Sequence, residues 1–405
     1  MARLAALTLA ALLALAGTAG ARAWTTPRLL APGGYDPAAA IGVASGAGVV
    51  YASRGGSRYA VTLRRGTVDR GLTRAVTVLR STHALDSPKL AFVSGSGTAA
   101  VAWRQLQGSR RLRLRRIPQR GQPDRVVRLT GAGESAFDPF FVPGPLNLVA
   151  WSRRTSAAAA MYDRYAYTVD LPRPLPAGAT SQIALAESAG TILAVWPQHG
   201  RVFAAAESFD ATSFGPATPI SPADGFARSP KIAADLLGNP VVVWTSSHGS
   251  GNAVLAAARL PGGAFTAPTE IAPATEGATS LNATLTADGA VLVTYVATGR
   301  SFPVTHFSGP VRLARLDAAP VTLTRAGERA TAVVASAGEV AWVRSGGAAH
   351  PIHTRAIGPG GVLGPVQTVP GAGATTPVQL TLAANASGRA ILAYVAKGVR
   401  VTLLR

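Results

Sequence analysis

The chain has 405 residues and no cysteine, so disulfides and thiolate metal sites are excluded and packing has to supply its stability. Charged residues make up only 14% of it, yet the formal net charge is +20, with 36 arginines among the 39 basic residues. Twenty basic and four acidic residues lie before residue 131. The positive charge is therefore concentrated in the first third of the chain, where it favours anionic partners through a long-range attraction that salt screens.

Residues 1–23 have the three parts of a secretory signal peptide. Arg3 lies in a short basic start, Leu4–Ala16 is an apolar run, and the segment ends in the small-residue sequence GTAGARA. We expect cleavage after Ala23, with Ala21 as the alternative, and a secreted, extracytoplasmic product. The apolar run is too short to span a membrane, and no later stretch approaches about 18 uninterrupted apolar residues.

A short apolar run that ends in an aromatic residue recurs eight times after this leader. Successive aromatic residues are 45 to 52 positions apart, with a mean of 49. Such a period indicates a repeat architecture, and the regular spacing predicts that these aromatic residues are core. We call them the anchors: Tyr51, Trp103, Trp151, Trp196, Trp244, Tyr295, Trp342 and Tyr394.

Each repeat has the same internal order of strands and turns. SPKLAFVSGSGTAAVAW (87–103) and SPKIAADLLGNPVVVW (229–244) both contain a strand, a glycine turn and a second strand, with Lys89 and Lys231 at the same place. A polar loop, a third strand, a Gly/Pro turn and a fourth strand follow. Four short strands in each repeat are typical of a β-propeller blade, and we expect helices to be nearly absent.

The two ends of the chain complement each other. The last repeat stops at Arg405 after its third strand, whereas WTTPRLLA (24–31) resembles the fourth strand FTAPTEIA (265–272). We therefore expect the N-terminal strand to pair with the C-terminal blade, because closing the ring removes the exposed end faces. The prediction is an all-β domain over 24–405, an eight-bladed propeller; seven blades are the alternative, since the third repeat (137–180) is irregular.

The stretch SPKIAADLLGNPVVVWTSSHGSGNAVLAAARLPGGAFTAPTEIA (229–272) resembles the secreted propeller repeats of GC-rich actinobacteria. Such repeats are similar to sialidases in fold only. The sialidase turn carries Ser-x-Asp-x-Gly-x-Thr-Trp, whereas SPADGF (221–226) and LTADGAVLVTY (285–295) place aspartate directly beside glycine. The resemblance therefore implies the fold and no sialidase activity.

Several residues could carry chemistry, but none forms a recognised motif. His199 and His248 follow two anchors in equivalent loops, whereas His350 and His353 are three apart on a predicted third strand and so take opposite faces. FDPFF (137–141) is interpreted as a first strand with a turn aspartate. We identify no catalytic residue and expect no metal and no cofactor, although carboxylates from distant blades could still converge at a ring mouth.

The strongest local charge feature is SRRLRLRRIPQRGQPDRVVR (109–128). On a strand, Arg111, Arg113 and Arg115 share one face and the intervening leucines take the other. Such a row can bind phosphates, uronates or sulfates bidentately. Alternatively, the charges protect an outer sheet edge from aggregation. Nucleic acid is not expected, because aromatic residues for base stacking are not interleaved with the arginines.

These observations predict a secreted, monomeric propeller that acts as a binding or interaction module. The expected ligand is an anionic glycan or cell-wall polymer, bound at Arg111, Arg113 and Arg115 or at a ring mouth, and a protein partner remains open. The alternative is a glycan-active hydrolase or lyase with its site at a mouth.

Overall fold

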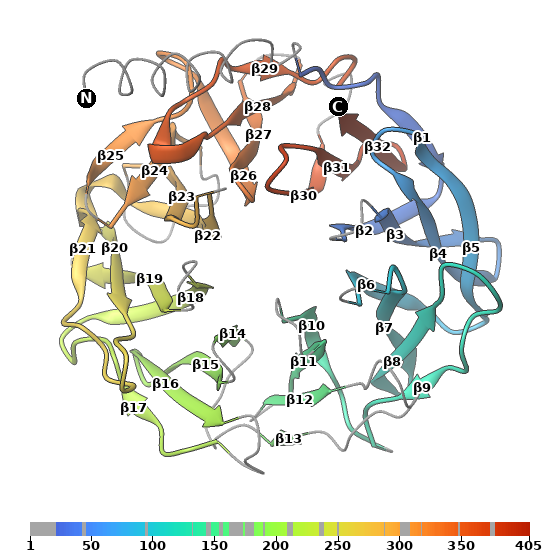
Figure 1. Cartoon of the computed structure of the whole chain (residues 1–405), viewed down its shortest axis with the longest axis horizontal. Helices are drawn as coiled ribbons and strands as arrows, with labels where there is room; N and C mark the ends of the chain where they lie inside the picture. Colours follow the sequence, from blue (N-terminus) through green and yellow to red (C-terminus); the bar gives the residue numbers. More distant parts are fainter. Residues whose placement is uncertain are drawn as a thin grey trace, which may run out of the picture.

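In the computed structural model, the described residues form eight four-stranded antiparallel sheets arranged as blades of a ring (Figure 1). The chain is an eight-bladed β-propeller, as predicted, and the seven-bladed alternative is wrong. The described residues are 22–42, 46–93, 96–131, 133–142, 147–153, 157–161, 173–174, 182–188, 191–208, 214–234, 239–248, 251–286, 288–299, 308–316, 318–346, 349–372 and 377–405.

The strands follow one another outward from the centre of the ring in every blade. The first four blades are blade 1, with β2 (Gly34–Ile41), β3 (Gly46–Gly55), β4 (Arg58–Thr67) and β5 (Gly71–Ser81); blade 2, with β6 (Leu85–Phe92), β7 (Ala99–Gln107), β8 (Ser109–Ile117) and β9 (Val127–Arg128); blade 3, with β10 (Phe137–Phe141), β11 (Leu148–Ser152), β12 (Ala157–Met161) and β13 (Arg173–Pro174); and blade 4, with β14 (Ala184–Ser188), β15 (Thr191–Gln198), β16 (Arg201–Ser208) and β17 (Thr218–Pro219).

The irregular third repeat thus forms a complete blade. The other four blades are blade 5, with β18 (Phe226–Ala234), β19 (Pro240–His248), β20 (Gly251–Ala258) and β21 (Thr269–Ala272); blade 6, with β22 (Ala278–Leu285), β23 (Val291–Ala297), β24 (Val311–Arg315) and β25 (Ala318–Thr322); blade 7, with β26 (Arg329–Ser336), β27 (Glu339–Ser345), β28 (Ile352–Ala356) and β29 (Gln367–Thr368); and blade 8, with β30 (Val378–Ala384), β31 (Ala390–Val395), β32 (Val399–Leu404) and β1 (Arg28–Ala31).

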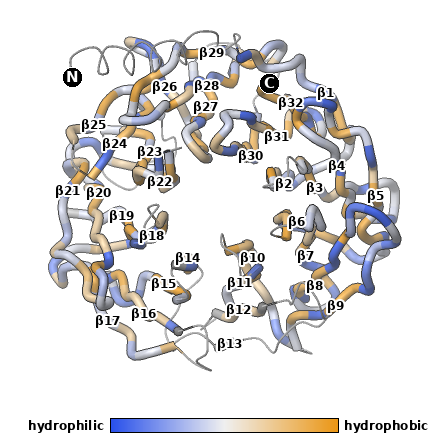
Figure 2. The backbone as a smooth tube through the Cα atoms, viewed as in Figure 1, coloured by the Kyte–Doolittle hydropathy of each residue, from blue (hydrophilic) through white to orange (hydrophobic). Residues whose placement is uncertain are grey.

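Helices are confined, among the described residues, to two single turns of 3₁₀ helix, Ala274–Glu276 and Pro359–Gly361. No helix in the described part of the chain has the length and apolar character that a membrane crossing requires. Hydrophobic stretches recur instead along the strands of the blades (Figure 2). The near absence of helices agrees with the missing 3.6-residue periodicity in the sequence.

The anchors form the core, as predicted, and each lies in the seam between two blades. All eight are at most 3% exposed. Trp103 of blade 2 packs with Val50 and Leu63 of blade 1, and the same order continues around the ring until Tyr51 of blade 1 packs with Ile391 of blade 8. Every seam therefore holds one aromatic residue that buries itself against the preceding blade, which gives the period of about 49 residues its physical cause.

The N-terminal strand completes blade 8, as the matching sequences predicted. β1 pairs with β32 in antiparallel register, with Arg28 opposite Val401 and Ala31 opposite Val399. Trp24 is 5% exposed, forms a bridge with Leu404, and donates its indole N–H to Thr354 Oγ1 of blade 7 at 2.7 Å. The two ends of the described chain are thus held together by one sheet. The predicted signal peptide lies almost wholly outside the described residues and stays a prediction.

A buried acid lies in the same seam between blades 7 and 8. The Glu339 side chain is 4% exposed, and Arg22 Nη2 lies 3.4 Å from its Oε2. Cleavage after Ala21 would keep this contact, whereas cleavage after Ala23 would remove it and leave the acid without its cation. Burial raises the pKa of this carboxyl to about 7, although the charge of Arg22 and the hydroxyl of Thr354 act in the opposite direction. The carboxylate form is therefore costly in the folded state at neutral pH.

Trp24→Ala should destabilise the fold by about 3 to 5 kcal/mol, because it removes a buried indole and leaves a cavity. Trp24→Phe should be milder, since it retains most of the apolar contact and loses the hydrogen bond to Thr354. Urea unfolding of the two variants measures both effects. If Trp24→Ala unfolded at the wild-type midpoint, the N-terminal strand would not be part of the closed ring.

Glu339→Gln should change how stability depends on pH. The folded-state pKa of about 7 lies above the ordinary value of 4.5, so the folded wild type binds the proton more tightly and loses stability as the pH rises from about 4.5 to about 7. Glutamine does not titrate, so the free energy of unfolding of the variant, relative to that of the wild type, should increase by up to about 3 kcal/mol as the pH rises across that window. Parallel curves for the two proteins would contradict the buried, protonated acid.

Candidate functional site

The predicted arginine row lies on β8, the third strand of blade 2. Leu112 and Leu114 are buried against blade 3. Arg111, Arg113 and Arg115 are half-buried on the opposite face, which is the face that carries Trp103 into the seam with blade 1. The structure thus places the three guanidiniums at the seam between blades 1 and 2, in the alternation that the sequence predicts for a strand.

Some arginines of this region hold the two blades together. Arg115 donates to the carbonyl oxygens of Asp124, at 2.6 Å, and of Val78 on β5, at 2.5 Å. Arg65 of blade 1 is 7% exposed and donates to three carbonyl oxygens of blade 2, and Arg74 donates to a fourth at 2.8 Å. These guanidiniums are used by backbone acceptors and are structural.

Arg111, Arg113 and Arg128 differ from those arginines, and we call these three the arginine cluster. Arg113 lies opposite Arg128 in the pairing of β8 with β9. Burial lowers the pKa of Arg113, and the positive charges of Arg111 and Arg128 lower it further. The Nε atoms of Arg111 and Arg113 are buried without a hydrogen-bond partner in the described structure. An anion at the surface of the cluster, where Arg128 is exposed, would relieve the mutual repulsion.

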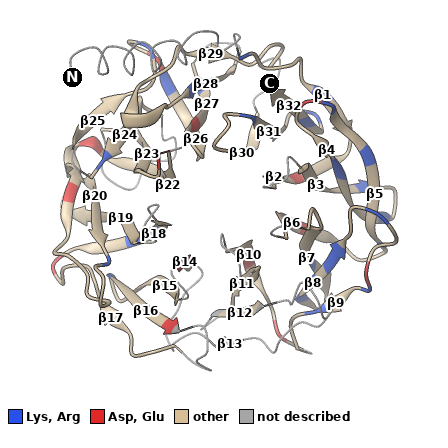
Figure 3. Ribbon diagram, in the orientation of Figure 1, with Lys and Arg blue, Asp and Glu red and all other residues tan. Residues whose placement is uncertain are grey.

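The surface around the arginine cluster is also basic. Residues 58–128 contain sixteen basic and only three acidic residues. Each of these acids is already paired with an arginine: Asp69 with Arg389, Asp86 with Arg104 and Asp124 with Arg116. Figure 3 shows the basic residues gathered on β4, β5 and β8. The exposed arginines of this surface are Arg58, Arg70, Arg74, Arg80, Arg110, Arg120, Arg125 and Arg128.

The centre of the ring is a second candidate site; the sequence predicted a possible site at a ring mouth but none of the residues that form it. Seven of the inner strands have a register shift against the second strand of their blade. Six residues beside these bulges have a positive φ although they are not glycine, and such backbone strain is often kept where a side chain or backbone group has to be aimed. They are Asp36, Ser87, Asp138, Ser229, Ser280 and Gln379.

Hydrogen bonds between neighbouring blades hold several of these bulges. Asp36 Oδ2 accepts from the backbone N–H of Ser87, at 3.0 Å, and Gln379 Oε1 accepts from that of Asp36, also at 3.0 Å. Gln182 Oε1 accepts from the N–H of Ser229 at 2.9 Å. Because Asp36 and Gln379 come from opposite ends of the chain, this inner rim closes the ring a second time.

Two adjoining cavities lie inside this rim. The larger, about 570 Å³, reaches from blade 2 to blade 6 and is lined by Lys89, Asp138, Gln182, Ser229 and Lys231 among other residues. The smaller, about 450 Å³, shares Lys89 with it and is also lined by Asp36 and Gln379. We call the larger one the central cavity.

The two lysines of the central cavity occupy equivalent positions, two residues after a bulge. Burial lowers the pKa of Lys89, which is half-buried, and the charges of Asp36 and Asp138 partly oppose this shift. Burial also lowers the pKa of Lys231. The Lys231 side chain remains exposed to solvent within the ring, and hydration limits this effect of burial. The Asp-Pro and Ser-Pro pairs that precede Lys89, Phe140 and Lys231 are the sequence signal that could have located this rim.

The histidines are spread over the molecule. His199 is exposed in a turn with a φ of 49°, and the side chain of His248, at the end of β19, lies outside the description. His350 precedes β28 instead of lying on it. His353 is buried, and its Nδ1 lies 2.8 Å from Glu328 Oε1, which also accepts the indole N–H of Trp342. Within the described ranges no group of three or more His, Asp or Glu is placed to hold a metal ion.

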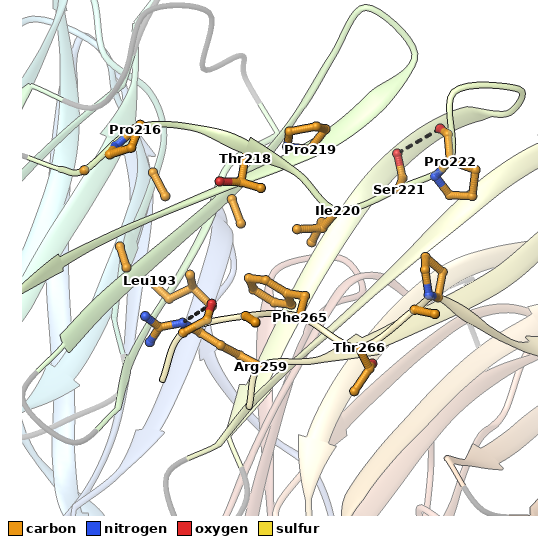
Figure 4. A pocket seen from close by; sticks show the side chains of 18 residues that line it. Leu193, Pro216, Thr218, Pro219, Ile220, Ser221, Pro222, Arg259, Phe265 and Thr266 are labelled. Atoms are coloured by element: carbon orange, nitrogen blue, oxygen red, sulfur yellow. Dashed lines mark hydrogen bonds between the residues drawn. The ribbon is translucent and has the colours of Figure 1, made fainter. Parts of the chain in front are cut away.

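A third hollow, of about 660 Å³, lies on the outer side of the seam between blades 4 and 5 (Figure 4). Leu193, Ile220 and Phe265 line it, and Arg259 is turned back on its own hairpin, with Nε donating to the carbonyl oxygen of Gly263. Apolar side chains and prolines dominate this wall, and it presents no cluster of charged groups.

Comparisons with known proteins support the fold and assign no activity. No family model matches the chain, and no curated protein matches it. Among solved structures, the chain is similar to the Dos1 propeller, with a TM-score of 0.56 and 11% identity over 95% of both chains. It is also similar to a prolyl endopeptidase, with a TM-score of 0.53 and 12% identity over 92% of this chain and 54% of that one. A third similar structure is a fungal alcohol oxidase of the AA5 family, with a TM-score of 0.51 and 13% identity over 95% of this chain and 76% of that one.

The chain thus spans about half the length of the prolyl endopeptidase. At these identities the similarity shows the propeller fold alone. Propellers serve as interaction scaffolds and also as parts of enzymes, so function has to be argued from the sites.

Arg65→Gln and Arg113→Gln should separate the two kinds of arginine. Arg65→Gln leaves three carbonyl oxygens without their donor and should cost at least about 2 kcal/mol. Arg113→Gln removes a charge that its neighbours repel, so its unfolding midpoint should equal or exceed that of the wild type. Denaturant titrations measure both. Equal destabilisation by the two changes would mean that Arg113 also holds the seam.

Proposed function

We propose that the protein is a secreted binding module for an anionic polysaccharide or cell-wall polymer, held by the arginine cluster of blade 2. The observation that carries the proposal is that Arg111, Arg113 and Arg128 lie together without a carboxylate partner among the described residues, so their positive charges act on one another. Guanidiniums bind sulfate, phosphate and uronate groups bidentately.

The geometry of the cluster favours a polymer over a small anion. Side chains on one face of a strand are about 7 Å apart, so Arg111 and Arg113 present two guanidiniums at about that spacing. Successive charged groups along an extended polymer can contact both. Arg128 adds a third donor on the neighbouring strand β9. The exposed arginines of blades 1 and 2 would extend this attraction along the outer wall.

Arg115 has a smaller part in this proposal than the sequence suggested. Its Nε and Nη1 already donate to the carbonyl oxygens of Asp124 and Val78, so it contributes through Nη2 and mainly orients the row. Its role in binding stays a prediction. Arg128, which adjoins Arg113, takes its place in the proposed contact set.

The triple change Arg111→Gln, Arg113→Gln and Arg128→Gln should weaken retention on heparin and on teichoic acid resins. Because each lost guanidinium removes a charged contact, the variant should elute at clearly lower salt, and wild-type retention should itself fall as salt increases. Elution on a salt gradient and titration calorimetry with soluble polymer measure the effect.

A matched variant controls for net charge. Arg28→Gln, Arg325→Gln and Arg344→Gln remove three exposed arginines from blades 7 and 8 and their connections and lower the charge by the same amount. This control should elute close to the wild type. If both triple variants eluted together, attraction would depend on net charge alone, as the edge-protection interpretation allows. Release of oligosaccharides during binding would instead favour the hydrolase or lyase alternative.

A further inference from the structure

We propose that the central cavity binds a small, singly charged polyhydroxylated acid of the hexuronic acid class, with its carboxylate at Lys231 and its hydroxyls at Asp138 and its neighbours. This site is distinct from the arginine cluster. It lies on the inner strands β6, β10 and β18, whereas the cluster lies on the outer strands β8 and β9 (Figure 1).

The choice of lysine is the first indication. The chain has only three lysines beside 36 arginines, and two of the three line one cavity. Each follows a bulge residue with a positive φ and a proline, as Ser87–Pro88–Lys89 and Ser229–Pro230–Lys231. The same strained backbone therefore aims two ammonium groups at the centre of the ring from blades 2 and 5.

The charges around the cavity indicate where an anion would bind. Asp36 and Asp138 both act on Lys89 and partly balance its charge. Lys231 has no such carboxylate among the groups that shift its pKa. Neither ammonium forms a hydrogen bond or a salt bridge with another described residue. Asp36 and Asp138 thus account for the charge of Lys89, whereas Lys231 in the wall of the central cavity is left for the single carboxylate of a ligand to neutralise.

The remaining lining suits hydroxyl groups. Asp138 is exposed to the cavity and has no hydrogen bond with the described residues, so its carboxylate can accept from two hydroxyls. The hydroxyls of Ser87 and Ser229 and the amide of Gln182 lie along the same wall. The volume of about 570 Å³ falls within the range of small-ligand sites. A monosaccharide acid fits the volume of the cavity, supplies a carboxylate for Lys231 and supplies hydroxyls for Asp138 and the other polar lining residues.

Titration calorimetry of the triple arginine variant, which lacks the other proposed anion site, with glucuronate, glucose and inorganic phosphate tests the assignment. Glucuronate should bind saturably at millimolar concentrations or below, and glucose and phosphate at least about tenfold more weakly, because each lacks one of the two kinds of group. Equal binding of glucose would overturn the role of the carboxylate, and equal binding of phosphate would overturn the recognition of hydroxyls. Heat without saturation for glucuronate would overturn the site itself.

Lys231→Met should weaken glucuronate binding at least about tenfold. Lys397→Met is the matched control, since Lys397 is exposed in the turn between β31 and β32, and it should bind as the wild type does. Equal binding by both variants would overturn the proposal. The triple arginine variant should keep glucuronate binding and Lys231→Met should keep polymer retention, so failure of one proposal leaves the other measurable.

The wild-type chain offers a readout that requires no variant. Reductive ¹³C-methylation keeps the lysine charge and labels only Lys89, Lys231, Lys397 and the N-terminus. On addition of glucuronate, the Lys231 methyl resonance should shift and that of Lys397 should not. A resonance of Lys231 that stayed in place at saturating ligand would contradict the carboxylate contact.

Discussion

Burial of sheet faces between neighbouring blades is the constraint on which the structure depends. A four-stranded sheet with an apolar side toward each neighbour is stable only when both sides are covered. Here each anchor covers the preceding blade, from Trp103 on blade 1 to Tyr51 on blade 8. Since the first blade needs the last one, the ring has to close. Trp24 and β1 complete the blade at which the two ends meet.

Because the core lies between the blades, the innermost and outermost strands of each blade are available for roles other than packing. The inner strands carry bulges whose strained backbone is fixed by side chains of neighbouring blades, as Asp36 fixes Ser87 and Gln182 fixes Ser229. Among the described residues, Lys89 and Lys231 form no hydrogen bond or ion pair and line a cavity. The outer strands carry the charge, and its excess is gathered on blades 1 and 2. The two proposed sites thus use parts of the blade that the core does not require.

The arginines show how one residue type acquires two roles. Arg65 and Arg115 have carbonyl oxygens within reach, so their charge is compensated by hydrogen bonds across the seam. Arg113 faces Arg128 and has a buried donor that nothing described satisfies. Like charges that oppose one another in this way weaken the fold, which makes these residues candidates for a binding role. The same reasoning separates Lys89, balanced by two aspartates, from Lys231.

The repeat of aromatic anchors, the four strands in each unit and the missing last strand determined the fold from sequence alone, because burial between blades imposes a period that residues such as Trp151 and Trp244 display directly. The alternation of arginine and leucine on β8 was also predicted from the sequence, since successive side chains of a strand point to opposite faces. Only the tertiary structure decided which arginines find a carbonyl oxygen and which face one another, for Val78 and Asp124 reach Arg115 through the seam and the β8–β9 loop. The central cavity also required the folded ring, because Lys89, Asp138 and Lys231 come from three blades and converge through closure.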